Sequence, residues 1–110
     1  MTIGGMTIGE LQHIVHGWIA GTGGGYFSPI TNAAVLAEET GEVARIMARR
    51  YGDQRPKPGD RTELSDLADE LADLIWVAAA IANQTGIDLT DAIARNIEKK
   101  NLRDSDRFKK

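Results

Sequence analysis

The chain is organised around two acidic runs, Leu36-Ala37-Glu38-Glu39-Thr40-Gly41-Glu42 and Asp69-Glu70-Leu71-Ala72-Asp73. If both runs are helical, Glu39 and Glu42 lie three residues apart on one face, and Glu70 and Asp73 repeat that spacing. Two such helices side by side would direct four carboxylates toward one place. Carboxylates gathered in this way repel one another unless protons or cations neutralise them. The two runs therefore predict neighbouring helices with a divalent metal between them.

Length and composition indicate one small domain. The chain has 110 residues and no cysteine, which excludes disulfides, iron-sulfur clusters and thiolate zinc sites. The longest apolar run, residues 74–82, is too short to cross a bilayer, and the first residues lack a signal-peptide pattern. We expect a single cytoplasmic domain over residues 1–110 without a membrane partner, in which residues 1–6 are flexible and residues 101–110 form a tail.

Apolar residues recur at spacings of three and four in four segments, which is the pattern of amphipathic helices. Thr7 is the predicted N-cap of the first segment, residues 7–20, with Glu10 completing a capping box. Ser28 and Pro29 start the second, which ends at Gly52. The third begins near residue 62 or 63 and stops at Gly86, and Asp88 or Thr90 caps the fourth.

No segment shows the strict alternation of a β-strand, so the predicted fold is all-α, a four-helix bundle with the second and third helices adjacent. The third helix is apolar almost all round from Trp76 onward, and a partner subunit would be the obvious cover. The glycine run at residues 21–25 is predicted to be a mobile loop, and residues 101–110 are predicted to be irregular.

The acidic runs offer only oxygen ligands, which favours magnesium. Di-iron bundles and zinc sites use histidine, and none stands at the corresponding positions. A lone Glu-x-x-Glu is usually a solvated face, but Asp73 runs into an apolar stretch and is expected to be at least partly buried, where an unpaired charge is costly. The residues alone leave a metal site and a solvated face as equal alternatives.

The two runs together resemble the Glu-Glu-x-x-Glu and Glu-x-x-Asp signature of the MazG-like all-α nucleotide pyrophosphohydrolases, relatives of the dimeric dUTPases and dCTP pyrophosphatases. The likeness covers nearly the whole chain and includes Leu11-Gln12, Trp18, residues 25–29, Tyr51-Gly52 and residues 101–108. It implies the MazG-like all-α NTP pyrophosphatase fold and hydrolysis of a nucleoside triphosphate to the monophosphate and pyrophosphate. The implied cofactor is Mg²⁺, with Mn²⁺ as a substitute, and the implied assembly is a homodimer or homotetramer.

The resemblance also implies roles for individual residues. The metal ligands would be Glu39, Glu42, Glu70 and Asp73, and Glu38 would act in catalysis by orienting the attacking water or holding a neighbouring metal. Magnesium would lower the pKa of bound water and neutralise charge on the triphosphate. Basic residues gather between Arg95 and Lys110, and Lys99, Asn101 and Arg103 match positions that meet the nucleotide in relatives. A solubilising charged terminus is the alternative.

Other side chains have less certain roles in the sequence. His16 and Trp18 could line a pocket for the nucleobase, although core or subunit packing is an equal alternative, and Trp76 is expected to serve packing. The arginines that follow the first acidic run are expected to form exposed ion pairs of little energetic value, and the aspartates one turn before Glu70 are expected to be solvated. These residues are Arg45, Arg49, Arg50, Asp66 and Asp69.

Three other functions compete with a broad pyrophosphohydrolase, whose physiological role at the level of the family would be the removal of non-standard nucleotides. One is a narrow dUTP or dCTP pyrophosphatase, since no base-selecting element is recognisable. Another is a catalytically silent helical module that binds a nucleotide or a protein partner, although a pure scaffold has no need of five acids. Nucleic-acid binding is disfavoured by the net charge of -3.

Overall fold

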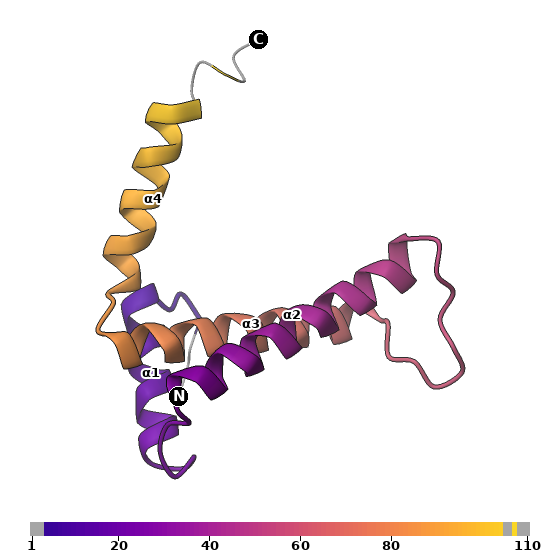
Figure 1. Cartoon of the computed structure of the whole chain (residues 1–110), viewed down its shortest axis with the longest axis horizontal. Coiled ribbons are helices and arrows are strands. Elements are labelled where there is room, and N and C mark those ends of the chain that lie inside the picture. The colour runs from indigo at the N-terminus through magenta and orange to yellow at the C-terminus, as the bar shows by residue number, and fades with distance from the viewer. Residues whose placement is uncertain (1–3, 105–106, 108–110) are drawn as a thin grey trace.

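The computed structural model describes residues 4–104 and residue 107, and within them the chain forms four helices and no strand (Figure 1). The helices are α1 (Ile8–Ala20), α2 (Pro29–Tyr51), α3 (Leu64–Thr85) and α4 (Leu89–Asp104). The predicted all-α class with four helices is confirmed. None of the helices in this part of the chain has the length and hydropathy of a membrane span.

The helix ends follow the predicted capping signals. Thr7 and Glu10 form the predicted capping box, with the Glu10 N–H donating to Thr7 Oγ1 at 3.0 Å. Ser28 caps α2 just ahead of Pro29. Gly86 ends α3 in the left-handed conformation with φ 72°, which glycine adopts at little cost. Asp88 is the N-cap of α4, because its Oδ1 accepts from the Thr90 N–H at 2.9 Å.

Helices α2 and α3 run antiparallel along most of their lengths (Figure 1). At one end the Asn32 side chain donates to Gln84 Oε1 at 2.8 Å. At the other end Arg50 donates to the carbonyl of Thr62 at 3.1 Å, just before α3 begins. The connection between the helices, residues 52–63, lies at this second end. The predicted pairing of the second and third helices is therefore present.

The main hydrophobic core lies at the α1 end of this pair. Val15 of α1 and Ala79 and Ala80 of α3 are buried there, with Trp76 packed against them. The Gln12 side chain fixes α1 to the start of α4, because its Oε1 accepts from the Leu89 N–H at 2.8 Å. The α1 end of the α2–α3 pair is thus held by apolar packing and by partly buried hydrogen bonds.

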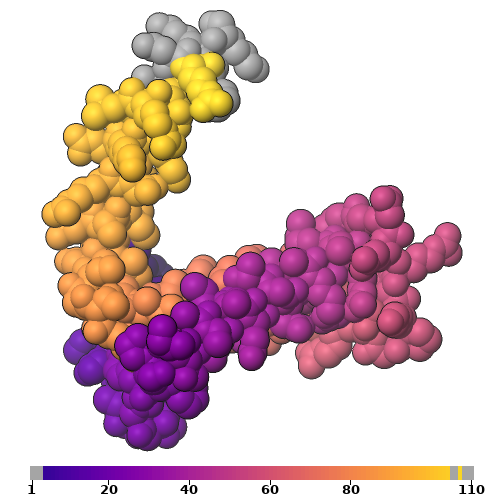
Figure 2. All heavy atoms as spheres, viewed as in Figure 1, coloured from indigo at the N-terminus to yellow at the C-terminus, as the bar shows by residue number. Residues whose placement is uncertain are grey.

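Helix α4 leaves this core as an arm. It contacts α1 and points away from α2 and α3, and the space-filling view shows it standing clear of the connection at residues 52–63 (Figure 2). The radius of gyration is 17.0 Å, against about 13 Å for a compact domain of this length. Large apolar side chains of α4 remain exposed, with Ile97 at 54% and Leu102 at 78%. The arm therefore has an apolar face that this chain does not cover.

The C-terminal prediction needs a correction. Helix α4 continues to Asp104, so residues 101–104 are helical and not irregular. The reason is local, because no glycine or proline interrupts the sequence after Leu89, and Leu102 and Arg103 favour helix. Residues 1–3 of the predicted flexible start, and residues 105, 106 and 108–110 of the predicted tail, lie outside the described residues.

The glycine run at residues 21–25 is fastened to the end of α1. The Gly23 N–H donates to the Trp18 carbonyl and the Gly25 N–H to the Ile19 carbonyl, both at 2.8 Å. A Cβ atom at Gly23 would stand 2.9 Å from the Trp18 ring, so this position needs glycine for close approach. The loop thereby covers one edge of the Trp18 indole.

Candidate active site

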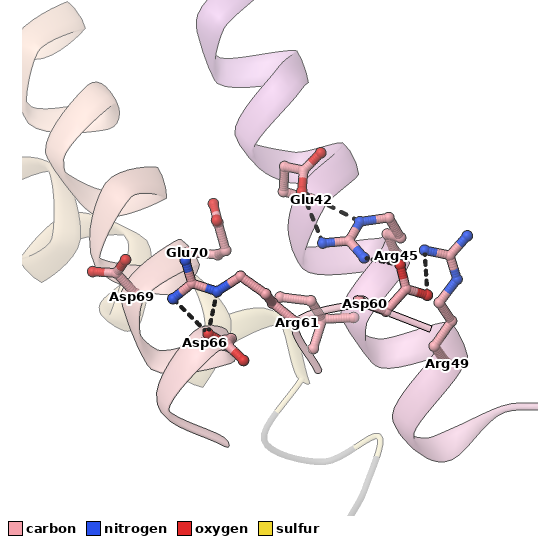
Figure 3. A pocket seen from close by; sticks show the side chains of 10 residues that line it. Glu42, Arg45, Arg49, Asp60, Arg61, Asp66, Asp69 and Glu70 are labelled. Carbon is pink, nitrogen blue, oxygen red and sulfur yellow. Dashed lines mark hydrogen bonds and ion pairs between the residues drawn. The ribbon is translucent and has the colours of Figure 1, made fainter. Parts of the chain in front are cut away.

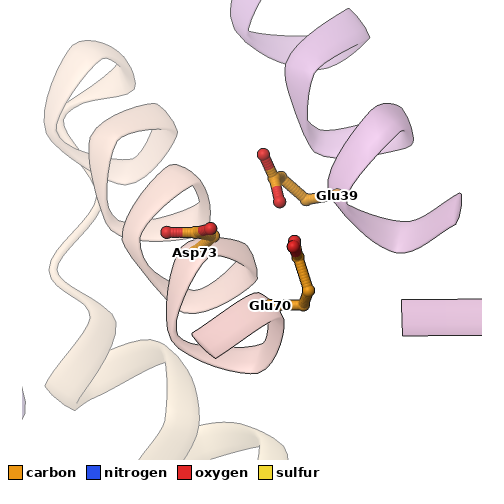
Figure 4. Close-up of side chains that lie close together, drawn as sticks. All are labelled: Glu39, Glu70 and Asp73. Atoms are coloured by element: carbon orange, nitrogen blue, oxygen red, sulfur yellow. The ribbon is translucent and has the colours of Figure 1, made fainter. Parts of the chain in front are cut away.

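Three acidic side chains converge between α2 and α3. Glu39 of α2 and Glu70 and Asp73 of α3 each offer a carboxylate oxygen, and these oxygens lie within 4.8 Å of one another (Figure 4). We call this group the acidic cluster. It contains three of the four residues that the two sequence runs predict as metal ligands, and it joins segments that are more than thirty residues apart in the chain.

The cluster forms because the helical periodicities of α2 and α3 match. Asn32, Glu39 and Ile46 recur every seven residues and share one face of α2, and that face meets α3. Glu39 and Glu70 are partly buried, whereas Asp73 is exposed. The expectation that Asp73 is at least partly buried is therefore wrong. Apolar sequence after a residue does not by itself cover it, because the main core lies farther along α3, where Trp76, Ala79 and Ala80 pack near Val15.

Glu42 has a different partner in this structure. Its Oε2 accepts from Arg45 Nη2 at 3.1 Å and from Arg45 Nε at 3.3 Å, and its side chain is 48% exposed. Both residues belong to α2, one turn apart. Glu42 therefore lies one turn from Glu39 and outside the acidic cluster, held by the neighbouring guanidinium group.

The crowding of the cluster has a direct electrostatic effect. A hydrogen bond with Glu70, partial burial, and the negative charges of Asp73, Glu70 and Glu42 raise the pKa of Glu39 to about 7. The metal-free cluster therefore retains a proton near neutral pH. A divalent cation would compete with that proton for the same oxygens.

Glu38 is exposed and is not part of the acidic cluster. It follows from helix geometry that its side chain leaves α2 about 100° from that of Glu39. Its catalytic role rests on the sequence motif and stays a prediction.

An apolar cavity of about 310 Å³ lies nearer to α1 along the α2–α3 pair, and its lining begins one turn from the cluster, at Val35 of α2 and Trp76 of α3. It lies between α1, α2 and α3, and Trp18 and Trp76 line it in an edge-to-face contact with ring centroids 5.7 Å apart. Asn32, which is 6% exposed, places an amide group in this aromatic and aliphatic lining. We call this space the aromatic cavity.

The two residues predicted to form a base pocket are separated. Trp18 lines the aromatic cavity, but His16 lines a shallow depression between α1 and the end of α3. His16 reaches the aromatic cavity only through Tyr26, whose hydroxyl lies 2.9 Å from His16 Nδ1. Trp76 lines the cavity as well as packing against the core, so packing is only part of its environment.

A polar cavity of about 370 Å³ lies on the opposite side of the cluster (Figure 3). The connection at residues 52–63 forms one wall of this cavity and leaves it partly open to solvent. Its charged lining comes from α2, from the connection and from α3, namely Glu42, Arg45, Arg49, Asp60, Arg61, Asp66, Asp69 and Glu70. We call it the arginine cavity. Glu70 belongs both to its wall and to the acidic cluster, so the two are continuous.

The ion pairs in this cavity are less exposed than the sequence suggested. Arg49 Nη1 lies 3.2 Å from Asp60 Oδ2, and each of these side chains is 18% exposed. Asp66 is 13% exposed and pairs with Arg61 at 3.0 Å. The expectation of solvated charges is therefore wrong for Arg49 and Asp66. The connection covers them, and the pattern of α2 and α3 gives no sign of that cover.

The predicted phosphate-binding residues of the C-terminal region are not at the acidic cluster of the same chain. Lys99, Asn101 and Arg103 belong to the outer half of α4, which points away from α2 and α3 (Figure 1). All three are exposed, and Arg103 pairs with Asp104 at 3.0 Å. Their role stays a prediction that a second chain would have to fulfil.

Sequence reasoning gave no site role to three residues that line the two cavities. Asn32 could have been found, because it stands one heptad before Glu39 on the same face of α2. Arg49 stands one heptad after Glu42 on that face. Asp60 gave no signal, because it lies in a connection without periodicity.

Comparisons with known proteins agree with this geometry. Residues 27–108 match the model of the MazG nucleotide pyrophosphohydrolase domain. The chain belongs to the MazG family. It is therefore an enzyme of the nucleotide pyrophosphohydrolase class, a hydrolase acting on phosphoric anhydrides, and the resemblance drawn from the two acidic runs is confirmed.

MazG relatives cover nearly all of the chain. The YpjD protein of Bacillus subtilis (strain 168) is 37% identical over 102 residues, which are 93% of this chain and 90% of that protein. The crystal structure of YpjD from Bacillus subtilis gives a TM-score of 0.77 at 35% identity, covering 92% of this chain and 99% of that one. A Bacillus-conserved MazG protein, described as a nucleotide pyrophosphohydrolase, gives 0.74 at 34% identity, covering 94% and 98%. The MazG-like all-α fold is thus confirmed.

Proposed function

We propose that this MazG protein hydrolyses nucleoside triphosphates to monophosphates and pyrophosphate in a magnesium-dependent reaction. One observation carries the proposal: Glu39, Glu70 and Asp73 converge between α2 and α3, with an aromatic cavity on one side and an arginine cavity on the other. A nucleoside triphosphate has a matching order of parts. Its aromatic base lies on one side of the bond to be broken, and its anionic β- and γ-phosphates lie on the other side.

The donor set fits magnesium. The cluster provides carboxylate oxygens, and the mutual repulsion that raises the pKa of Glu39 would be offset by a bound cation. Glu39, Glu70 and Asp73 would hold the ion, and Glu42 would join them by leaving Arg45. Mn²⁺ has similar ligand preferences and is the expected substitute. When bound, the ion lowers the pKa of a water ligand and offsets charge on the phosphates.

The reaction replaces one bond to phosphorus by another. A water oxygen attacks the α-phosphorus, the bond from that phosphorus to the bridging oxygen breaks, and pyrophosphate leaves with the electron pair of that bond. The proposed part of Glu38 is to orient this water and to accept its proton. Glu38 is assigned on its place in the motif, next to Glu39.

The aromatic cavity is the proposed site for the base. Trp18 and Trp76 offer ring surfaces for stacking, and the Asn32 amide can exchange hydrogen bonds with a base edge. His16 stands behind Tyr26 and acts on the cavity through that hydroxyl. We therefore assign Trp18, Trp76 and Asn32 to base recognition, with His16 in support.

A homodimer or homotetramer is the proposed working form. Its support is the uncovered apolar surface, which includes Ile93 and Ile97 on α4 and Ile75 on α3. A second copy could cover α4 and bring its Lys99, Asn101 and Arg103 to the phosphates at the first copy's cluster. Sedimentation equilibrium tests the assembly, and a monomer at all concentrations would contradict it.

The test of activity is direct. The protein is incubated with individual standard and modified nucleoside triphosphates and Mg²⁺, and the products are identified by anion-exchange chromatography. We expect equal amounts of monophosphate and pyrophosphate, and loss of both with Glu39→Gln, whereas Asp53→Asn, at an exposed acid of the connection that lines neither cavity, serves as the control. Absence of products with every nucleotide would favour a catalytically silent binding module.

A narrow pyrimidine enzyme is the second candidate. The observation that favours it is the small aromatic cavity of about 310 Å³ with Asn32 as a fixed amide in its wall. The same nucleotide series decides this, because a dUTP or dCTP enzyme would prefer one base strongly. A broad profile that includes damaged bases would instead support removal of non-standard nucleotides.

A further inference from the structure

The aromatic cavity, the acidic cluster and the arginine cavity follow one another along the α2–α3 pair, and we call this line of three zones the groove. The family motif does not specify their order. Asn32 and Val35 of α2 line the aromatic cavity, Glu39 belongs to the cluster, and Glu42 to Arg49 line the arginine cavity. Along the antiparallel α3 the same three zones follow in reverse chain order. At about 1.5 Å per residue, Glu39 lies about 6 Å beyond Val35, and Arg49 about 15 Å farther along the axis. The three zones therefore form one line.

We propose that the arginine cavity is the pyrophosphate site, in which Arg45 and Arg49 bind the β- and γ-phosphates. This inference rests on the proposed function, because it assigns the part of the nucleotide that leaves. With the base in the aromatic cavity and the α-phosphate at the cluster, the remaining two phosphates extend along the groove into the arginine cavity.

Arg49 has hydrogen-bonding capacity left for an anion. A guanidinium group has five N–H donors, and in the described part of the chain that of Arg49 makes one interaction, the 3.2 Å ion pair with Asp60. The Arg49 side chain is only 18% exposed, so its surroundings hold it in place before a ligand binds. A pre-positioned arginine with free donors suits the planar, bidentate recognition of phosphate oxygens.

Arg45 is placed to release a second pair of donors. Its Nε and Nη2 now bind Glu42, and its Nη1 lies 3.9 Å from Asp60 (Figure 3). If Glu42 turns to the cluster as a ligand, both of these N–H groups face the cavity while Asp60 keeps the guanidinium group nearby. The two N–H groups of Arg45 that bind the Glu42 carboxylate in this structure can then bind a phosphate.

Asp60 is the positioning residue for both arginines. It is held in a tight turn, where its Oδ2 accepts from the Lys57 N–H at 2.8 Å and Gly59 adopts φ +87°. This turn brings the carboxylate over α2 and sets the spacing of the two guanidinium groups. Of the other acids in the wall, Asp66 is paired with Arg61 and Glu70 belongs to the cluster, whereas Asp69 is exposed to solvent.

The test measures how tightly each product binds. Inhibition constants for pyrophosphate and for the nucleoside monophosphate are determined in Mg²⁺ for the wild type and for Arg49→Gln. Arg55→Gln is the matched control, because Arg55 is an exposed cation of the same connection that does not line the cavity. For Arg49→Gln we expect the pyrophosphate constant to rise about 10- to 100-fold, as for loss of hydrogen bonds to a charged group, while the monophosphate constant stays within about twofold.

A second variant separates binding from folding. Arg49→Lys keeps the charge without the fork and should recover part of the pyrophosphate affinity, and circular dichroism should show native helix content in each variant. An equal change in Arg49→Gln and Arg55→Gln, or an equal change for both products, would overturn the proposal. Titration calorimetry with pyrophosphate and Mg²⁺ tests the cavity even if no nucleotide is hydrolysed, so its failure is distinct from failure of the proposed function.

Discussion

The two ends of the α2–α3 groove are built from opposite chemistry. The α1 end is enclosed by Trp18, Trp76 and the alanines of α3, and its polar groups are hydrogen-bonded. The loop end is enclosed by ion pairs that Asp60 and Arg61 make with α2 and α3. The acidic cluster lies between the two. A ligand with two equal ends could bind in either orientation. A nucleotide has an aromatic base at one end and anionic phosphates at the other, so it fits in one orientation.

The largest effect on activity is expected at the acidic cluster, which lies between the two ends. Glu39→Gln removes a carboxylate from the cluster and should lower hydrolysis at least about 100-fold, since changes outside the ligand shell already cost 10- to 100-fold. Mn²⁺ affinity, measured by electron paramagnetic resonance, should fall with it. Retained Mn²⁺ affinity and activity would show that the metal site lies elsewhere.

A smaller and selective effect is expected at the α1 end. Trp18→Ala removes a stacking surface and should raise the inhibition constant of the nucleoside monophosphate about 5- to 100-fold, without a change for pyrophosphate. Trp18→Phe is the control that keeps an aromatic ring. If both products lose affinity equally in Trp18→Ala, the ends of the groove do not act separately.

The pH dependence of stability tests the cluster without a substrate. The fold raises the pKa of Glu39 to about 7, so folding favours the protonated form. That contribution to stability is fully present below the pKa of the unfolded chain and is lost as the pH rises through about 7. The Tm of the metal-free protein should therefore fall between pH 5 and pH 8, and added Mg²⁺ should raise it more at pH 8 than at pH 6.

Differential scanning calorimetry measures this slope. Glu39→Gln cannot ionise at this position and should flatten the decline, whereas Asp53→Asn, at an exposed acid far from the cluster in the chain, should preserve it. A Tm that rises from pH 5 to pH 8, or a slope unchanged in Glu39→Gln, would contradict the assigned origin of the raised pKa.

The smallest effect is expected at the outer rim of the loop end. Arg61 is 81% exposed in its pair with Asp66, and exposed pairs contribute about 0–1 kcal/mol. Arg61→Ala should therefore change the free energy of unfolding by less than about 1 kcal/mol in urea and should affect pyrophosphate binding less than Arg49→Gln. If Arg61→Ala weakened pyrophosphate binding more than Arg49→Gln, the anion site would lie at the outer rim and not inside the arginine cavity.

The sequence predicted what depends on local or matched periodicity. The capping residues Thr7 and Ser28 define helix starts by their own side chains, and the spacing of Glu39 against Glu70 and Asp73 predicts the cluster once two helices pair. The direction of α4 was not predictable, because the short turn between Gly86 and Asp88 sets it and not the pattern of α4. The Asp60 contacts were missed for a related reason, since they depend on the path of an irregular connection.

The orientation of the nucleotide in the groove is the central claim, and nuclear magnetic resonance of the ¹⁵N-labelled protein tests it most directly. The two indole N–H signals of Trp18 and Trp76 report on the α1 end, and the backbone amides of Gly59 and Asp60 report on the loop end. With Mg²⁺ present, pyrophosphate should shift only the loop signals, a nucleoside monophosphate only the indole signals, and a non-hydrolysable triphosphate both. Indole shifts caused by pyrophosphate, with the loop signals unmoved, would contradict the account.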